Sequence, residues 1–295
     1  MSCVRAVLPI MGSCIAFLLG ILCLFAGSQR QLLPQASLLT LYTGGAGGPG
    51  APDYFSVYTM SYCTGFQETC VSDETTNATT TKNEIVGCSD RNVLFTFNPS
   101  DAILKAMGTP SGSLSPDSWP TCITDDFEAM GPTNTTMVVF FIFGTTSAAL
   151  AIAARIWSIA CARASGNSRP PSYTGDPSPR FDFETPPSLV EFLIFLVISI
   201  RLTYLSLQLS LLSFGLASII ASVITTEFVK LINTSGNEYG VSATTGTSFL
   251  GMAWTAAVLQ GLCTLYSLVD IFRYRARCRM PTSESAEQKP LVGSD

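Results

Sequence analysis

The sequence of 295 residues contains no histidine. Histidine is the commonest general base and the commonest metal ligand among side chains, so its absence excludes Ser-His-Asp hydrolases, Cys-His nucleophiles and the usual metal hydrolases. The sequence also has no GxxxxGK[ST] phosphate-binding loop. Acidic residues outnumber basic ones by 21 to 16, and the net charge of −5 disfavours nucleic-acid binding. We therefore expect no enzyme, no cofactor, no nucleic-acid partner and no small-molecule substrate.

Charged residues are scarce, at 13% of the chain, which is about half of the usual fraction in a soluble domain. They leave four uncharged runs, each longer than the roughly 20 residues that a helix needs to cross a membrane. We therefore predict an all-α membrane protein in which four transmembrane helices form a bundle. The predicted spans are residues 6–27, 137–154, 202–226 and 241–269.

Basic residues indicate how these spans are oriented. Eleven of the 16 Lys and Arg residues lie in segments 1–5, 155–201 and 270–295. Because Lys and Arg near the ends of spans resist translocation, this bias predicts that both termini lie in the cytoplasm. Segments 28–136 and 227–240 then lie outside. The N-glycosylation acceptors all fall in these two outer segments: Asn77, Asn134 and Asn233.

Two of the runs allow a second interpretation. The first resembles a cleaved signal peptide, because Arg5 precedes it and small residues follow it, but its length favours a retained span. The third begins at Leu189 and continues past Arg201. Burying an arginine at mid-bilayer would cost a few kcal/mol, so we place Arg201 at the cytoplasmic boundary and residues 188–200 in an interfacial lead-in helix. Six prolines in residues 164–187 predict a disordered linker before it.

The 28–136 loop has to fold in water with few apolar residues, and it carries an even number of cysteines. In an oxidising compartment these predict two disulfides, with three connectivities open. The cysteines are Cys63, Cys70, Cys88 and Cys122.

Sequence patterns within this loop predict a small β-rich domain. Residues 38–42, 54–62 and 93–97 are rich in aromatic and β-branched residues and are expected to be strands. Asn98 followed by Pro99 predicts a capped helix that ends at residue 107. The aromatic side chains of the second strand form either the core of the domain, which we favour, or a binding face: Tyr54, Phe55, Tyr58 and Tyr62.

Small residues recur at helical spacing in every predicted span, and such stripes let helix backbones approach closely in lipid. They serve either packing within the chain or lateral assembly with other molecules. The stripes are Gly12, Ala16 and Gly20; Gly144 and Ala148; Ser213, Ala217 and Ala221; and Ala253, Ala257 and Gly261. The two amides in spans three and four, Gln208 and Gln260, lie at similar depth. We predict that both face the bundle interior, where they bond each other or nearby hydroxyls.

The remaining cysteines lie within or beside the predicted spans. Cys14, Cys23 and Cys263 are inside them and are expected to be inert apolar side chains, which disfavours a thiol-based membrane enzyme. Three others adjoin the cytoplasmic ends and are either palmitoylation candidates or ordinary interfacial thiols: Cys3, Cys161 and Cys278. Four arginines between residues 273 and 279 follow the last span, where they hold the topology or attract anionic lipid.

Four spans, cytoplasmic termini and a large first outer loop with paired cysteines are similar to the claudin arrangement. Three segments of the loop, at residues 37–43, 58–65 and 88–99, resemble the fungal Sur-seven/PalI family, and the resemblance covers about residues 1–275. It implies that Cys63 and Cys88 take the positions of the family's loop cysteines and that the other two loop cysteines are additional. No Trp precedes Cys63, so claudin-like strand formation between cells is not implied.

The resemblance implies a plasma-membrane protein that is a non-enzymatic organiser of fungal cortical membrane domains of the eisosome type, acting in membrane organisation, wall integrity or polarity. Its implied partners are membrane lipids and other membrane proteins, or further copies of itself. A role in ambient-pH signalling, as in the PalI branch, is disfavoured by the short cytoplasmic tail of residues 270–295. A transporter or channel subunit is disfavoured because no Asp, Glu, Lys or Arg falls within the four predicted spans.

Overall fold

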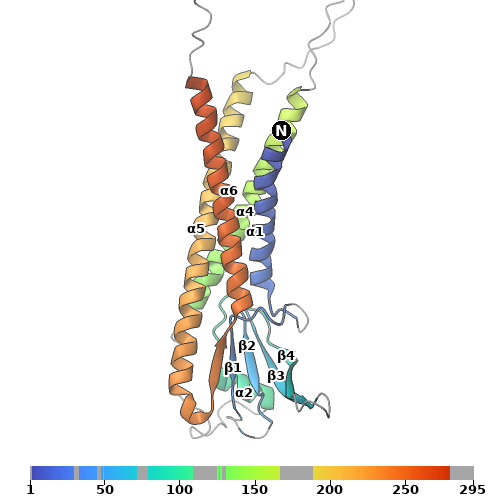
Figure 1. The fold of residues 1–295 in the computed structure, drawn as a ribbon, viewed down its shortest axis with the longest axis vertical. Coiled ribbons are helices and arrows are strands. Elements are labelled where there is room, and N and C mark those ends of the chain that lie inside the picture. Colours follow the sequence, from blue (N-terminus) through green and yellow to red (C-terminus); the bar gives the residue numbers. More distant parts are fainter. Residues whose placement is uncertain are drawn as a thin grey trace, which may run out of the picture.

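The computed structural model describes residues 2–29, 33–44, 48, 50–71, 79–108, 125, 127, 131–166 and 189–279. Four long helices lie side by side, and a β-sheet caps one end of the bundle (Figure 1). The N-terminus and the end of the last helix lie at the opposite end. The helices are α1 (Ser2–Phe25), α4 (Gly131–Gly166), α5 (Leu189–Ser235) and α6 (Thr247–Arg279). Each contains a stretch that is long and apolar enough to cross a membrane.

Helix α5 differs from its prediction, because it runs unbroken for 47 residues. We expected an interfacial lead-in helix at residues 188–200; these residues are helical from Leu189, and they continue into the predicted span without a break. No proline interrupts the sequence from Leu189 to Ser235, and neither the arginine at 201 nor the polar residues beyond 226 break a helix. The helix therefore extends past the predicted span at both ends and reaches the sheet. Helix α6 begins at Thr247, later than the predicted start of its span.

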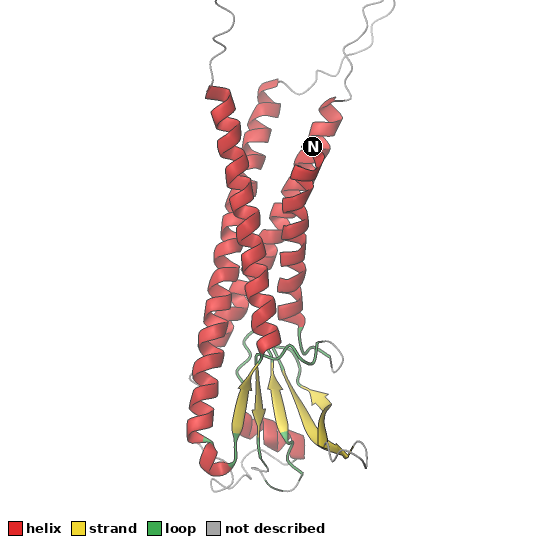
Figure 2. Cartoon of the chain, viewed as in Figure 1, coloured by secondary structure: helices red, strands yellow, loops and turns green. Residues whose placement is uncertain are grey.

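The sheet has five antiparallel strands in the order β4-β3-β2-β1-β5 (Figure 2). Four of them come from the first loop and the fifth from the short segment between α5 and α6. That fifth strand was not expected, because four residues of Ser, Ala and Thr form no periodic pattern. The strands are β1 (Leu39–Tyr42), β2 (Tyr54–Val57), β3 (Tyr62–Val71), β4 (Thr79–Cys88) and β5 (Ser242–Thr245). We call these strands, α2 and the segments between them the sheet domain.

Two of the strand predictions need correction. The expected strand at residues 54–62 is two strands joined by a tight turn, closed by a hydrogen bond from the Tyr58 amide to the Ser61 carbonyl at 2.8 Å. Residues 93–97 are irregular, although Phe95 and Phe97 are buried as strand residues would be. Apolar alternation indicated burial there but not backbone pairing.

The short helix α2 (Pro99–Met107) follows its prediction closely. The Asn98 side chain accepts a hydrogen bond from the Asp101 amide, and proline occupies the first turn. Gly108 ends the helix in the left-handed conformation, with φ of 67°. Ala102 and Ile103 are buried against one face of the sheet, so this helix covers that face.

Candidate functional site

Several side-chain hydrogen bonds join the sheet domain to the ends of the bundle helices. Helix α1 ends at Phe25, and its last carbonyls have no partner within the helix. The β2–β3 turn supplies partners, because the Thr59 hydroxyl donates to the Cys23 carbonyl and the Ser61 hydroxyl donates to the Gly27 carbonyl, both at 3.1 Å. The sheet domain thus caps α1 directly.

Arg91 adds a second contact to the same helix end. Its guanidinium donates to the Leu24 carbonyl at 3.4 Å and lies 4.2 Å from the centre of the Phe25 ring. A cation near free carbonyls at a helix C-terminus is stabilising, and a cation over an aromatic face adds to that.

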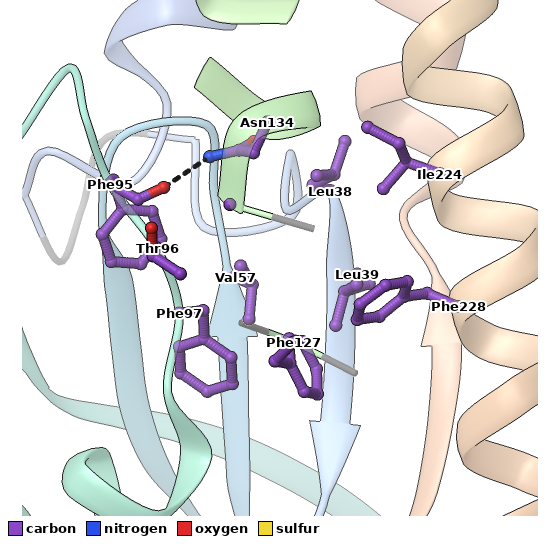
Figure 3. Close-up of a pocket in the computed structure, with 11 residues that line it drawn as sticks. Leu38, Leu39, Val57, Phe95, Thr96, Phe97, Phe127, Asn134, Ile224 and Phe228 are labelled. Atoms are coloured by element: carbon purple, nitrogen blue, oxygen red, sulfur yellow. Dashed lines mark hydrogen bonds between the residues drawn. The ribbon is translucent and has the colours of Figure 1, made fainter. Parts of the chain in front are cut away.

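Asn134 joins the first turn of α4 to the sheet domain (Figure 3). Its amide nitrogen donates to the carbonyls of Thr59 and Phe95, at 3.2 and 3.0 Å. Its amide oxygen is buried without a hydrogen-bond partner. We predicted a glycosylation acceptor at this position, but a glycan on this nitrogen would displace at least one of the two bonds. The geometry therefore favours a structural role.

Asn233 has a similar role on the other side of the junction. Its side chain donates to the Ala243 carbonyl at 3.1 Å and accepts from the Ala243 amide at 2.7 Å. This pair of bonds imitates a neighbouring strand and closes the free edge of β5. Asn233 was also expected to carry a glycan, and its amide is committed to this pairing instead. The third acceptor, Asn77, lies outside the described residues.

The core of the junction is aromatic. The Phe127 ring centre lies 5.1 Å from that of Phe97 and 4.6 Å from that of Phe228, both edge to face. Because Phe228 belongs to α5, the outer end of that helix forms part of the sheet domain's core together with Ile232. Figure 3 shows Phe97, Phe127 and Phe228 beside an apolar cavity of about 40 Å³ between the sheet, α4 and α5.

Cys63 and Cys88 form a disulfide that links β3 to β4. This is one of the two bridges that the sequence predicts, and it is the pair that the family resemblance implies. The second bridge stays a prediction, because Cys122 lies outside the described residues and the side chain of Cys70 is not described.

The aromatic side chains of β2, the following turn and β3 are buried or packed against other rings, as expected for core residues. Tyr54, Phe55 and Tyr58 are almost completely buried, and Tyr62 packs on Phe95 and Phe97. Burial raises the pKa of Tyr58 to about 12 and also raises the pKa of Tyr54 and Tyr62. The Tyr58 hydroxyl donates to the Pro34 carbonyl at 2.9 Å.

The small residues of the spans lie in the bundle interior. A Cβ atom at Gly20 would come within 2.6 Å of Thr145 and 2.7 Å of Phe214, so two neighbouring helices occupy the space that a side chain would need. Ser210 of α5 donates to the Gly144 carbonyl of α4 at 3.0 Å. Of the predicted stripes, only Gly12 and Gly261 are half-exposed; the other members are buried. The stripes therefore serve packing within the chain.

The two span amides do not pair. Gln260 is fully buried, as expected for an inward orientation, but neither its nitrogen nor its oxygen has a hydrogen-bond partner. Gln208 is only half-buried. The expectation that the two bond each other is wrong. Thr264, the neighbouring hydroxyl, donates to the backbone carbonyl of residue 260 instead of to its side chain.

The described span thiols are free, with Cys23 and Cys263 buried and Cys14 half-buried. The palmitoylation candidates Cys3 and Cys161 lie in α1 and α4, and Cys278 lies in α6. Their side chains are outside the described part of the chain, so that role stays a prediction. Sequence reasoning missed Arg91, Asn134 and Asn233 as junction residues. Two of them stood in glycosylation motifs, and their long-range partners leave no local signal.

Four membrane-crossing helices with a disulfide-linked antiparallel sheet at one end define a multi-pass membrane protein with a claudin-like fold. The pattern of the SUR7/PalI family matches residues 5–266, which is nearly the whole chain. The chain therefore belongs to the SUR7/PalI family. No curated protein and no solved structure matches it.

Proposed function

We propose that this protein is a non-enzymatic organiser of the plasma membrane, with both termini in the cytoplasm and the sheet domain outside. The observation that carries the proposal is the continuity of α5, which passes from the bundle into the core of the sheet domain through Phe228 and Ile232. An organiser of this kind has to hold an outer surface at a fixed height and orientation above the lipid. Here one unbroken helix provides that connection.

Bonds to the other helices support the same role. The β2–β3 turn caps α1, Asn134 ties α4 to the turn, and β5 leads directly into α6. All four helices therefore connect to the sheet domain. Lateral forces on the outer surface would be transmitted to the whole bundle rather than absorbed in a flexible linker.

The outward face of the bundle supplies a surface for lateral contacts. Small residues are used inside, and large apolar side chains project outward, where lipid tails, other membrane proteins or further copies of the chain would meet them. On α5 this face comprises Leu205, Leu209, Leu212, Leu216, Ile219 and Val223, which are 43–62% exposed. Membership of the SUR7/PalI family supports cortical membrane domains as the setting.

The test compares a tagged full-length chain with two variants in the organism that encodes it. Phe228→Ala removes a ring from the junction core, whereas Leu231→Ala removes a side chain of similar size that is 37% exposed on the same helix. We expect the parent chain and Leu231→Ala to form stable surface patches with slow fluorescence recovery, and Phe228→Ala to disperse. Surface labelling restricts the comparison to molecules that reach the plasma membrane. A parent chain that diffuses freely, or that resides in endosomes, contradicts the proposal.

A further inference from the structure

The two faces of the sheet differ in how they are covered by the rest of the chain. The face that carries Leu39 and Phe55 is covered by α2 and the outer end of α5. The opposite face, which carries Thr40 and Ser56, is turned toward the viewer in Figure 1, with α2 behind the strands. A groove of about 490 Å³ lies on this opposite face, which is within the size range of small-ligand sites.

The groove lies where the sheet meets the bundle. Pro34 and Gln35, from the loop after α1, form one side, and Thr247, the first residue of α6, forms the other. If the four helices cross the membrane, this is the level of the outer lipid headgroups. A ligand could reach it from the lipid surface or from the aqueous side.

The groove wall is polar but carries no formal charge among the described residues that line it. Six of these residues offer a hydroxyl or an amide, and Pro34 and Ile85 offer apolar surface. An anionic ligand would call for Arg, Lys or a nest of backbone amides, and a cationic ligand for a carboxylate. Hydroxyls and amides, which both donate and accept, suit a neutral ligand with many hydroxyls. The six are Gln35, Ser37, Thr40, Ser56, Asn83 and Thr247.

Tyr54 supplies an independent observation. Its side chain is 2% exposed and forms part of the groove wall, yet its hydroxyl has no hydrogen-bond partner. Gly65 leaves the space that this hydroxyl occupies, because a Cβ atom there would collide with the end of the tyrosine. A buried hydroxyl without a partner is destabilising in the free protein. A ligand in the groove that supplies a donor or an acceptor would satisfy it.

We propose that this groove binds a neutral glycan, carried either by a glycolipid headgroup or by a free saccharide chain. The side chains of Pro34 and Ile85 would contact the apolar C–H face of a sugar ring, and the hydroxyl and amide groups would contact its edge. The proposed organiser role does not require a ligand, so glycan binding would be an additional function.

The experiment uses the full chain in phosphatidylcholine nanodiscs, because alkyl glycoside detergents carry a sugar that would compete. Maltotriose and laminaritriose test the free-saccharide source by calorimetry, and glucosylceramide in the nanodisc tests the lipid source by thermal shift. Tyr54→Phe deletes only the unpartnered hydroxyl and should leave the unfolding temperature unchanged or higher. Tyr62→Phe is the matched control, since it deletes the same group on the covered face of the sheet. Thr40→Tyr fills the groove.

We expect one of the two sources to bind saturably. Tyr54→Phe should weaken that binding about fivefold to tenfold, the size of one hydrogen bond. Tyr62→Phe should leave it unchanged, and Thr40→Tyr should abolish it. Binding by a trisaccharide assigns a free chain, and a thermal shift with glucosylceramide alone assigns a lipid headgroup. If neither source binds, or if Tyr54→Phe binds as tightly as the parent chain, the proposal is overturned, while the organiser role is tested separately by patch stability.

Discussion

The molecule has two hydrophobic cores that are built from different kinds of side chain. The sheet domain is filled by aromatic rings such as Phe55, Phe97 and Phe228. The bundle also contains Phe141 and Phe214, but many of its buried residues are alanines, glycines and serines. In water, large rings are favoured because burying apolar area is itself the driving force. In lipid that force is absent between helices, and close backbone approach takes its place. One chain thus follows two packing rules in two solvents.

The largest expected effect comes from emptying the aromatic core. Phe55→Ala should lower the free energy of unfolding of the sheet domain by about 3–5 kcal/mol, because the residue is fully buried and its ring contacts Tyr62 and Phe97. Phe66→Ala on β3 is the control, since that side chain is 38% exposed. Thermal unfolding of both variants measures the difference, and equal losses would show that the sheet domain lacks an aromatic core.

Removing the disulfide should have the next largest effect on stability, and this effect should also be confined to the sheet domain. Replacing Cys63 and Cys88 by serine should destabilise the sheet domain by about 3 kcal/mol, as expected for a bridge closing a loop of 25 residues. Protease resistance of the four helices in nanodiscs should stay unchanged. Helices that become sensitive together with the sheet would mean that the two cores unfold as one unit.

Adding a single methyl group should test whether the helices of the bundle pack closely. Gly20→Ala should destabilise the protein by about 1–3 kcal/mol, because the new Cβ would collide with Thr145 and Phe214. Gly215→Ala, where no atom lies within 4 Å of the added Cβ, should be neutral or slightly stabilising. Thermal unfolding in the same nanodiscs compares them, and a neutral Gly20→Ala would mean that the helices do not pack closely.

A smaller effect, and of opposite sign, is expected at Gln260. Replacing this buried, unpartnered amide by leucine should stabilise the bundle by about 1 kcal/mol. Gln208→Leu should change stability less, because that side chain is half-buried and can reach other partners. A destabilised Gln260→Leu would show that the amide makes a hydrogen bond after all.

The smallest effect at ordinary pH concerns Tyr58, whose pKa is raised to about 12 by burial in the folded sheet domain. Its ordinary pKa is about 10. The unfolded state therefore loses the phenol proton first, so the stabilisation is complete below about pH 10 and is lost as the pH rises toward 12. Ultraviolet titration of tyrosinate would follow this loss in the parent chain. Tyr58→Phe should make stability less dependent on pH in that range, and an unchanged dependence would contradict the assignment.

Features that depend on local sequence could be predicted, and features that depend on distant partners could not. Hydropathy located four membrane helices, and Asn98 with Pro99 located the start of α2. β5 was missed because its pairing with β1 depends on residues about 200 positions away in the chain. The length of α5 was missed because hydropathy predicts only the apolar part that crosses the lipid, whereas a helix can continue into polar sequence at both ends.

The same distinction applies to the site. The glycosylation motifs at Asn134 and Asn233 are local patterns, and they pointed to a role that the long-range hydrogen bonds of both amides now disfavour. The spacing of the small residues located the stripes but left open whether they face the bundle or other molecules, because spacing does not determine which way a helix face points. The pairing of Gln208 with Gln260 did not follow from their equal depth, because depth does not determine which helix faces meet.

The length of α5 makes it a lever. Its 47 residues span about 70 Å at the helical rise, more than twice the roughly 30 Å of hydrocarbon in a bilayer. A change of about 10° in its tilt about the membrane midplane would carry the sheet end roughly 6 Å along the surface. Helix tilt responds to bilayer thickness, so a sheet domain that keeps a fixed height and position needs a bundle that holds the tilt of α5 constant.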